Sequence, residues 1–332
     1  MLMPEPAIAR VPTKTFADAP ALILGPDGRT YINPGKEAQQ AWIANLNDNP
    51  VELGAGATRD FELQARAEAG RRGDLQIGQI VCDVSPANHP FRATIYSLLL
   101  DKAFSSAPVH SECFAGTAGF PFVLPCAFWV EAGGFAQVKL ENLSSTQALT
   151  IRLGFIGWKY MGYGETPWAP TKDEVYQHMA TRRWHPFWLS TITSPFSLTA
   201  NQTSSMQTLQ VPGECDLLCH GILIRRECAT RFNLLKSRSG APLFENKMPD
   251  TLVAGDARTP FLFPFKHLFK RNTQIVLDID EVDGVGGSVF FYLLCTALYD
   301  DEPDERTLRT IALPYGTQAL PTVPVQYPYS LR

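Results

Sequence analysis

The chain has 332 residues, of which 45% are hydrophobic and 19% are charged, and its formal net charge is −4. That length predicts two domains with separate cores, and the composition excludes a disordered chain. No stretch is basic enough to follow a phosphate backbone, and no apolar run approaches the ~20 residues of a membrane span, so neither nucleic acid nor membrane is an expected partner. The 26 Pro, 24 Gly and 20 Phe favour many short strands over long helices.

Residues 1–73 are predicted to form an N-terminal arm that contains one hairpin. Leu22–Leu24 and Thr30–Ile32 flank Pro26-Asp27-Gly28, and this tripeptide is typical of a turn. The opening residues have neither the basic nor the apolar region of a signal peptide.

Two short helices are also predicted in this arm, over 36–46 and over 59–69. Ala38, Trp42 and Leu46 recur at four-residue spacing, and Thr58 is the expected N-cap of the second helix. These pieces are too small to form a core alone. They are therefore expected to pack on later domains or on a neighbouring subunit.

The rest of the chain is predicted to be mostly β, as two tandem β-sandwich or jelly-roll-like domains. The first domain covers 74–160 and closes with a hairpin made of strands at 138–142 and 151–158. A linker follows at 161–186, with one helix that begins at a Thr-x-x-Glu capping box. The second domain covers 187–301, and 302–332 is a Pro-rich C-terminal arm expected to run extended.

An internal repeat supports the two domains. Pro121-Phe122-Val123-Leu124-Pro125 matches Pro260-Phe261-Leu262-Phe263-Pro264, and each is followed by an apolar strand that begins with Gln. Further along, Ile151 matches Val289. Proline at both ends of the motif removes backbone donors, so the motif is predicted at a sheet edge or in a crossing loop. The order of these elements favours a duplication.

Polar residues in the second half could suggest a metal, but their spacing argues against one. In a strand, Cys215 and Cys219 lie ~13 Å apart, too far to share a tetrahedral zinc with His220 and Cys228. Asp278, Asp280, Glu281 and Asp283 miss the calcium-loop spacing, and the segment from Asp283 to Gly287 is better interpreted as a turn between the last two strands. The seven cysteines, most of them in apolar runs, are predicted to be buried thiols rather than a disulfide framework.

No motif for catalysis is present. His89 and His185 each precede Pro-Phe and are predicted to be edge or surface residues, because no nucleophile elbow accompanies them. The chain is therefore predicted not to be an enzyme and to need no metal or cofactor. A hydrolase or lyase on a β scaffold stays open as a less favoured alternative.

Large aromatic residues surround the linker. They are predicted to fill a seam between the two domains, and the alternative is a platform on which sugar rings stack. The residues of this candidate seam are Trp158, Trp168, Trp184, Phe187 and Trp188.

The layout resembles β-sandwich virion proteins of tailed bacteriophages. The elements that carry this resemblance are short segments in both halves: Gln210-Val211-Pro212-Gly213 leading into Asp216-Leu217-Leu218, Gly240-Ala241-Pro242-Leu243-Phe244, Thr259 to Pro264, Asn142-Leu143-Ser144, and the closing strand from Leu153 to Lys159. The second domain ends in Cys295-Thr296-Ala297 where the first has Gly-x-Lys, so a contact made by that Gly and Lys is in doubt there.

The resemblance implies a non-enzymatic structural role in a capsid decoration, neck, collar or tail-attachment protein. The expected partners are copies of the chain and other virion proteins such as capsid, portal or tail subunits, and the expected location is the virion after synthesis in the host cytoplasm. A carbohydrate- or receptor-binding module is the alternative, with a glycan as ligand. The candidate assembly contacts are Trp42, Ile43, Phe61, Tyr315, Tyr327 and Tyr329. Deletion of residues 1–70 is expected to leave a folded but unassembled protein.

Overall fold

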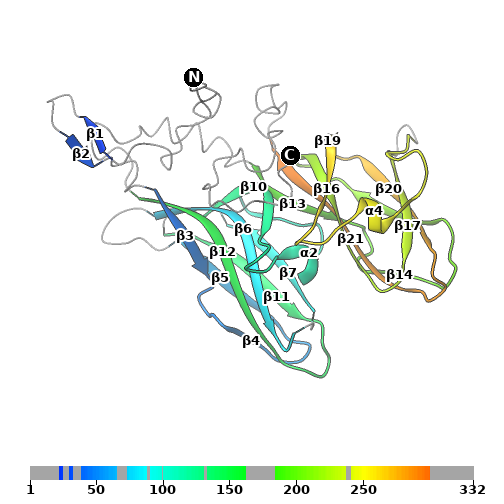
Figure 1. Cartoon of the computed structure of the whole chain (residues 1–332), viewed down its shortest axis with the longest axis horizontal. Coiled ribbons are helices and arrows are strands. Elements are labelled where there is room, and N and C mark those ends of the chain that lie inside the picture. The colour runs from blue at the N-terminus through cyan, green and yellow to red at the C-terminus, as the bar shows by residue number, and fades with distance from the viewer. Residues whose placement is uncertain are drawn as a thin grey trace, which may run out of the picture.

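The computed structural model of the chain is shown in Figure 1. It describes residues 22–24, 30–32, 39–65, 73–87, 90–98, 100–130, 133–161, 184–236 and 241–299. Within these ranges the fold is mostly β, in two tandem sandwiches of antiparallel strands. Among the described residues, no helix has the length and apolar character needed to cross a lipid bilayer.

The first sandwich consists of two facing sheets. One has the strand order β10-β6-β12-β3 with β4 also paired to β12, and its strands are β3 (Gln39–Asn45), β4 (Val51–Leu53), β6 (Gly73–Ser85), β10 (Phe122–Val130) and β12 (Leu149–Met161). The other has the order β5-β11-β7-β8 with β9 also paired to β7, and its strands are β5 (Thr58–Gln64), β7 (Phe91–Ser97), β8 (Lys102–Ala103), β9 (Val109–His110) and β11 (Phe135–Asn142). The short helix α2 (Ser111–Phe114) follows β9.

The second sandwich repeats this plan. One sheet has the order β13-β21-β16-β19 with β14 also paired to β21, and its strands are β13 (Trp184–Ser190), β14 (Phe196–Leu198), β16 (Asp216–Arg226), β19 (Phe261–Phe269) and β21 (Gly287–Leu298). The other has the order β15-β20-β17-β18, and its strands are β15 (Ser205–Gln210), β17 (Thr230–Lys236), β18 (Met248–Pro249) and β20 (Gln274–Glu281). The short helix α4 (Asp250–Val253) follows β18.

Each sandwich is a jelly roll. If β3 with β4 counts as one strand position, and β8 with β9 as another, eight positions follow one another along the chain. The sheets of the first sandwich then have the orders 1-8-3-6 and 2-7-4-5. In the second sandwich β13 with β14 counts as the first position, and its two sheets have the same orders. Consecutive positions thus alternate between facing sheets through much of the fold, as in a double-sheet jelly roll.

Two glycines show that the repeat extends to single residues. Gly116 makes two backbone hydrogen bonds with β6: its N–H donates to Ile80 O at 3.2 Å, and its carbonyl oxygen accepts from Cys82 N at 2.9 Å. Gly255 makes the same pair with Ile222 and Ile224, at 3.2 Å and 2.8 Å. A Cβ at either glycine would lie 2.0 Å or less from a backbone oxygen, so both turns require glycine. The duplication inferred from the sequence therefore includes local backbone geometry.

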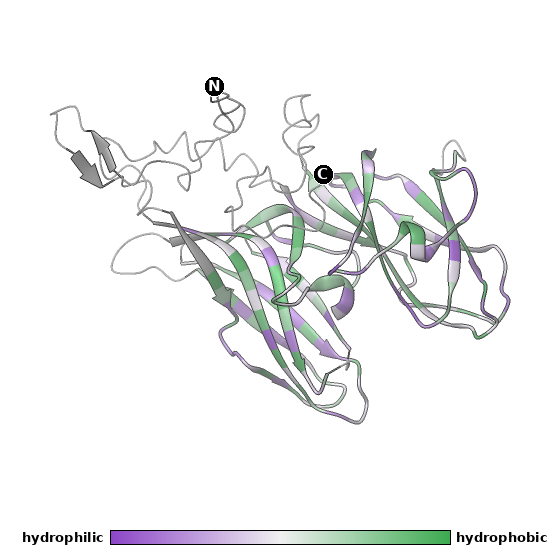
Figure 2. Ribbon diagram, viewed as in Figure 1, coloured by the Kyte–Doolittle hydropathy of each residue, from purple (hydrophilic) through white to green (hydrophobic). Residues whose placement is uncertain are grey.

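Alternating apolar side chains fill both cores. Every second side chain of β7 is buried, beginning with Phe91, and every second side chain of β11 is buried, beginning with Ala136. Figure 2 shows the resulting hydrophobic stretches in the strands of both sandwiches. Full burial of one such Phe or Leu side chain contributes roughly 1.5–3 kcal/mol.

Three predictions made from the sequence are confirmed. The strands Leu22–Leu24 and Thr30–Ile32 pair as an antiparallel hairpin, β1 with β2. Both copies of the Pro-Phe motif lie in edge strands, β10 and β19. The segment 282–286 connects the last two strands, β20 and β21.

Two predictions about local structure are wrong. The helices expected over 36–46 and 59–69 are replaced, where the structure describes them, by strands β3 and β5, which pair with β12 and β11. The first sandwich therefore begins at Gln39, and residues 39–64 belong to it rather than to an arm. Pairing with partner strands far away in the sequence, rather than local residue spacing, decided the conformation of both segments.

The hairpin expected between 138–142 and 151–158 is also wrong. These segments form β11 and β12, which lie in different sheets, β11 beside β5 and β7 and β12 beside β3 and β6. In both strands alternate side chains are buried. This pattern is the same whether the two strands pair in one sheet or face each other across the core, so the sequence does not distinguish the two arrangements. The linker helix and the C-terminal arm lie outside the described residues.

Candidate assembly interface

The two sandwiches meet at a seam where backbone groups of one pair with backbone groups of the other. Trp188 N donates to Phe104 O at 2.9 Å, and Ser106 N donates to Trp188 O at 3.1 Å. Ser190 N donates to Ser106 Oγ at 2.8 Å. The segment after β8 thus runs beside β13 as a short parallel bridge. These bonds fix the position of one sandwich on the other.

Trp188 is the largest side chain of the seam. It is 1% exposed, and its Nε1 donates to Cys113 O at 3.2 Å. Its ring lies 5.9 Å from that of Phe114 and 6.0 Å from that of Phe122, centroid to centroid. A buried indole keeps its apolar face packed while its N–H is satisfied, so Trp188 joins the first core to the second sandwich.

Tyr292 on β21 adds a polar anchor. Its hydroxyl donates to Pro108 O at 3.1 Å and accepts from His110 N at 3.0 Å. Burial raises the pKa of Tyr292 well above its usual range, so the hydroxyl stays protonated and can donate. The apolar cluster of the first sandwich extends across the seam to Leu223, Ala257 and Leu294 as well.

The rim of the seam is charged. Arg225 Nε lies 2.9 Å from Glu112 Oε2, and Lys102 Nζ lies 2.7 Å from Glu214 Oε2. These side chains are between about a third and a half exposed, so each pair contributes little, about 1 kcal/mol at most. Ala257 N also donates to Glu112 O at 2.7 Å. The energy of the seam therefore comes from its apolar centre.

Buried histidines line the same region. The ring of His185 stacks on Phe104 with centroids 4.4 Å apart. Its Nδ1 faces Pro186 O at 2.9 Å and must carry the proton, so Nε2 accepts from the Tyr299 hydroxyl at 2.7 Å. Burial lowers the pKa of His185 to about 4, and burial with the nearby Arg225 and Arg92 lowers that of His110 to about 3. Both rings are neutral at neutral pH.

Acid is therefore expected to destabilise the protein through His185. The unfolded chain binds this proton near the ordinary pKa of 6.5 and the folded chain only near 4, so stability is present above 6.5 and is lost as the pH falls toward 4. The expected loss at about pH 5 is about 2 kcal/mol for this one histidine.

Urea unfolding at about pH 7.5 and about pH 5 measures this loss. His185→Phe keeps the stack on Phe104 but cannot titrate, so its pH dependence is expected to be smaller by that amount. An equal pH dependence in the variant and the wild type would contradict the assignment.

The structure distributes the predicted seam residues between several places. Trp188 lies at the seam, whereas Phe187 points into the core of the second sandwich. The backbones of Trp158 and Trp184 belong to β12 and β13, but their side chains, and all of Trp168, lie outside the described residues. Sequence reasoning missed Phe104 and Tyr292, for which no local pattern gave a signal.

The predicted assembly contacts also separate. Ile43 on β3 is 62% exposed and stays a candidate. Phe61 is 2% exposed in the core of the first sandwich, so its prediction as an assembly contact is wrong. It lies on β5, which belongs to the sandwich and not to an arm. The backbone of Trp42 lies in β3, and its side chain and Tyr315, Tyr327 and Tyr329 lie outside the described residues.

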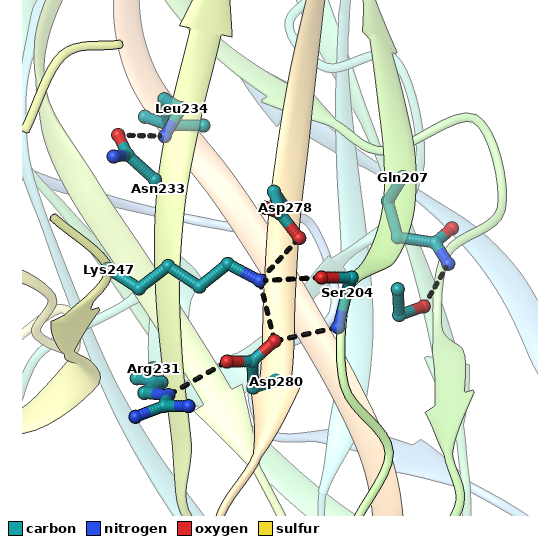
Figure 3. Close-up of polar contacts among 9 residues, drawn as sticks. Ser204, Gln207, Arg231, Asn233, Leu234, Lys247, Asp278 and Asp280 are labelled. Carbon is teal, nitrogen blue, oxygen red and sulfur yellow. Dashed lines mark hydrogen bonds and ion pairs between the residues drawn. The ribbon is translucent and has the colours of Figure 1, made fainter.

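The acidic residues of β20 form a structural network (Figure 3). Lys247 Nζ lies 2.6 Å from both Asp278 Oδ1 and Asp280 Oδ1, and Arg231 Nε lies 2.8 Å from Asp280 Oδ2. Burial alone would raise the pKa of Asp280, but hydrogen bonds from Lys247, Ser204 N and Arg231 outweigh it and lower the pKa. The ammonium group thus occupies the space between the carboxylates where a bound cation would lie.

The remaining candidates for chemistry are also engaged. Glu281 accepts from the backbone N–H groups of Asn201, Asp283 and Val285 and so orders the turn before β21. No group of three His, Cys, Asp or Glu side chains that could hold a metal occurs in the described part of the chain. All seven cysteines are free, and burial raises the pKa of Cys82 and Cys126 to about 12, so these thiols stay protonated.

The zinc candidates do not converge. Cys215, Cys219 and Cys228 are buried in the second core, and His220 Nε2 instead bonds Thr296 Oγ1 at 2.8 Å. Desolvation lowers the pKa of His220. His89 lies outside the described residues.

Comparison with known proteins finds no matching family model and no matching curated protein. Among solved structures, the chain was aligned with the tandem CBM22-1-CBM22-2 domain of Paenibacillus barcinonensis Xyn10C, at 8% identity over 79% of this chain and 98% of that one, with a TM-score of 0.15. It was also aligned with vicilin from Capsicum annuum, at 9% identity over 71% and 75% of the two chains, with a TM-score of 0.16. Scores this low carry no argument about fold or function.

Proposed function

We propose that the chain is a non-enzymatic structural subunit that assembles in many copies, as a virion protein of a tailed phage on the capsid or at the neck or collar. The phage setting comes from the resemblance of its sequence. Jelly rolls occur in viral capsids, lectins and cupins, so the strand order is compatible with a virion role and does not by itself select it.

The observation that carries the proposal is the seam. It joins two jelly rolls through backbone hydrogen bonds, Trp188 and Tyr292 into one block, as a subunit that transmits mechanical load requires. The same burial counts against the alternative, because a sugar ring cannot stack on a tryptophan that is 1% exposed. Trp168 remains the candidate for a glycan platform.

Exposed apolar side chains supply a further argument. Ile43 on β3, Leu252 on α4 and Phe265 on β19 are 62%, 62% and 81% exposed. Apolar side chains that gather into a patch on a surface mark contacts with other molecules. A subunit within an ordered particle would bury them against its neighbours.

The mass and shape of the purified full-length protein test the proposal. Mass photometry over a range of concentrations is expected to show multiples of the 36.8 kDa chain, and negative-stain images are expected to show regular assemblies. A strict monomer up to about 100 μM, well above the affinities of specific interfaces, would contradict it. Saturable binding in a glycan array, abolished by Trp168→Ala, would favour the carbohydrate-binding alternative.

A further inference from the structure

Equivalent strands of the two sandwiches differ in burial. All residues of β10 but one are buried, whereas most residues of β19 are exposed or half-buried. The fifth residue of each strand shows the contrast best, because Cys126 is buried beside Thr296 of β21 and Phe265 is 81% exposed. The strands have the same place in their sheets, so the difference arises from what covers them. Strands β13 and β21 of the second sandwich pack on β10, whereas among the described strands β19 has close contact only with β16 of its own sheet.

The short helices show the same contrast. The third residue of α2 is Cys113, which is buried and accepts the Trp188 indole N–H through its carbonyl. The third residue of α4 is Leu252, which is 62% exposed. The surface formed by α4 and β19, on which Leu252 and Phe265 are exposed, therefore corresponds to the surface that the first sandwich uses in the seam. We call it the free donor face.

The first sandwich carries the matching half. On the second sandwich, Trp188 pairs with Leu294 of β21, and Leu294 follows Val289 by five residues. On the first sandwich, Ile43 pairs with Ile156 of β12, and Ile156 follows Ile151 by five residues. Val289 and Ile151 are themselves equivalent, because they pair with the first residues of β14 and β4. Ile43 thus occupies on the first sandwich the place that Trp188 occupies on the second.

The neighbours of Ile43 complete this surface, which we call the free acceptor face. Val81 corresponds to the buried Leu223, because each forms the parallel bridge to the equivalent glycine, Gly116 or Gly255. Gly154 stands in the place of Tyr292, and a Cβ there would lie 2.9 Å from Val81 and 3.5 Å from Ile43. The face is therefore apolar and flat, without the hydroxyl anchor of the seam.

We infer that the free donor face of one chain docks on the free acceptor face of a second copy, so that the seam inside the chain is repeated between chains, head to tail. The inference rests on the proposed function and names its contact surface. Figure 1 shows β3 on the left of the first sandwich and α4 and β19 in the second sandwich on the right, so the two open halves lie on different sandwiches of one molecule.

This contact differs from the seam in its charges. The second residue of α4 is Thr251 where α2 has Glu112, and Asp83 stands in the place of Arg225, two residues after the bridging position. Asp83 is paired instead with Arg152 of its own chain at 3.1 Å. The ion pair between Arg225 and Glu112 is therefore not repeated, and the association is expected to persist in about 0.5 M salt, which screens exposed charges.

A contact of this kind is heterologous, because each chain offers two different surfaces. Such contacts close into a ring when the repeated rotation returns to the start, and otherwise extend as a filament. In both cases every chain but a terminal one uses both faces. A chain with one face blocked can therefore form only one junction.

Lysine substitutions at exposed positions test each face in the full-length protein. Leu252→Lys with Phe265→Lys blocks the donor face, and Ile43→Lys blocks the acceptor face. Each variant is expected to raise the dissociation constant for self-association about 30-fold or more, as for loss of interface hot spots. Val285→Lys, at a residue 72% exposed in the turn between β20 and β21, adds outside both faces the single charge that Ile43→Lys adds within one, and is expected to assemble normally. Unchanged melting temperatures show that each variant is folded.

Mixing the two blocked variants gives the decisive result. One retains an intact acceptor face and the other an intact donor face, so an equimolar mixture is expected to form dimers and nothing larger by mass photometry. Wild-type protein that never associates would overturn both this inference and the proposed function. Wild-type assembly that is matched by the lysine variants, or a mixture that stays monomeric, would overturn the head-to-tail contact alone.

Discussion

Replacing Trp188 with alanine is expected to lower the free energy of unfolding by about 3–5 kcal/mol, the usual cost of removing a buried aromatic side chain. The substitution removes the packing on Phe114 and Phe122 and leaves Cys113 O without its donor. Because these contacts join the two sandwiches, we expect the wild-type protein to unfold in one cooperative transition and the variant to unfold in two, one for each sandwich. Calorimetry, together with urea unfolding followed by circular dichroism, measures both effects.

The neighbouring residue supplies a matched control for that experiment. Phe187 precedes Trp188 on β13 and is also buried, but it points into the core of the second sandwich. Phe187→Ala is expected to destabilise the second sandwich by a similar amount while the seam contacts stay in place. If Trp188→Ala and Phe187→Ala give the same unfolding profile, the seam does not couple the two sandwiches.

The sequence predicted the repeated part of the fold because the repeat is written in residues with strong local preferences. Proline excludes central strand positions, so the two Pro-Phe motifs identified edge strands, and both lie in β10 and β19. Glycine and aspartate likewise located the turn before β21. These signals act over a few residues and need no knowledge of the partner strand.

The first three strands of the sandwich had no such signal. β3 reads Gln-Gln-Ala-Trp-Ile-Ala-Asn, which carries alanine and glutamine where a strand usually has β-branched residues. Its conformation depends on β12, which pairs with it from Gly154 to Tyr160. A jelly roll has eight strand positions, and the segment 74–160 alone cannot supply them. That count, applied to the repeat, would have placed 39–64 in the first domain.

The seam was predictable only in part. A cluster of tryptophans near a domain boundary indicated an apolar contact, and Trp188 lies in it. Residues 104–106 lie more than 80 residues before Trp188 and Ser190, which they contact across the seam. Pro108 and His110 lie more than 180 residues before their partner Tyr292. Such pairings follow from the relative position of two finished sandwiches, and no periodicity within one strand encodes them.

The largest change in stability is expected when the N-terminal truncation extends into the first sandwich. Deletion of residues 1–70 removes β3, β4 and β5, and with β3 and β5 one edge strand of each sheet of the first sandwich. The side chains lost include Val51, Leu53, Phe61 and Leu63, all buried in the first core. Burial of each contributes roughly 1.5–3 kcal/mol, and their sum approaches the whole stability of a domain, about 5–15 kcal/mol. This variant is therefore expected to have an unfolded first sandwich, and the earlier expectation that it stays folded is corrected.

Deletion of residues 1–38 is the matched experiment. It leaves every described strand of both sandwiches intact, because the first of them begins at Gln39. We expect the melting temperature of this variant to stay within about 4 °C of the full-length value, the shift produced by about 1 kcal/mol in a domain of this size. If residues 1–38 contribute to assembly, the mass distribution of the deletion variant at a given concentration will shift toward smaller species while its fold is retained. Loss of the folded state on deletion of 1–38 would show that the first sandwich needs this segment. A folded variant 71–332 with an intact first sandwich would contradict the assignment of β3 to β5 to the core.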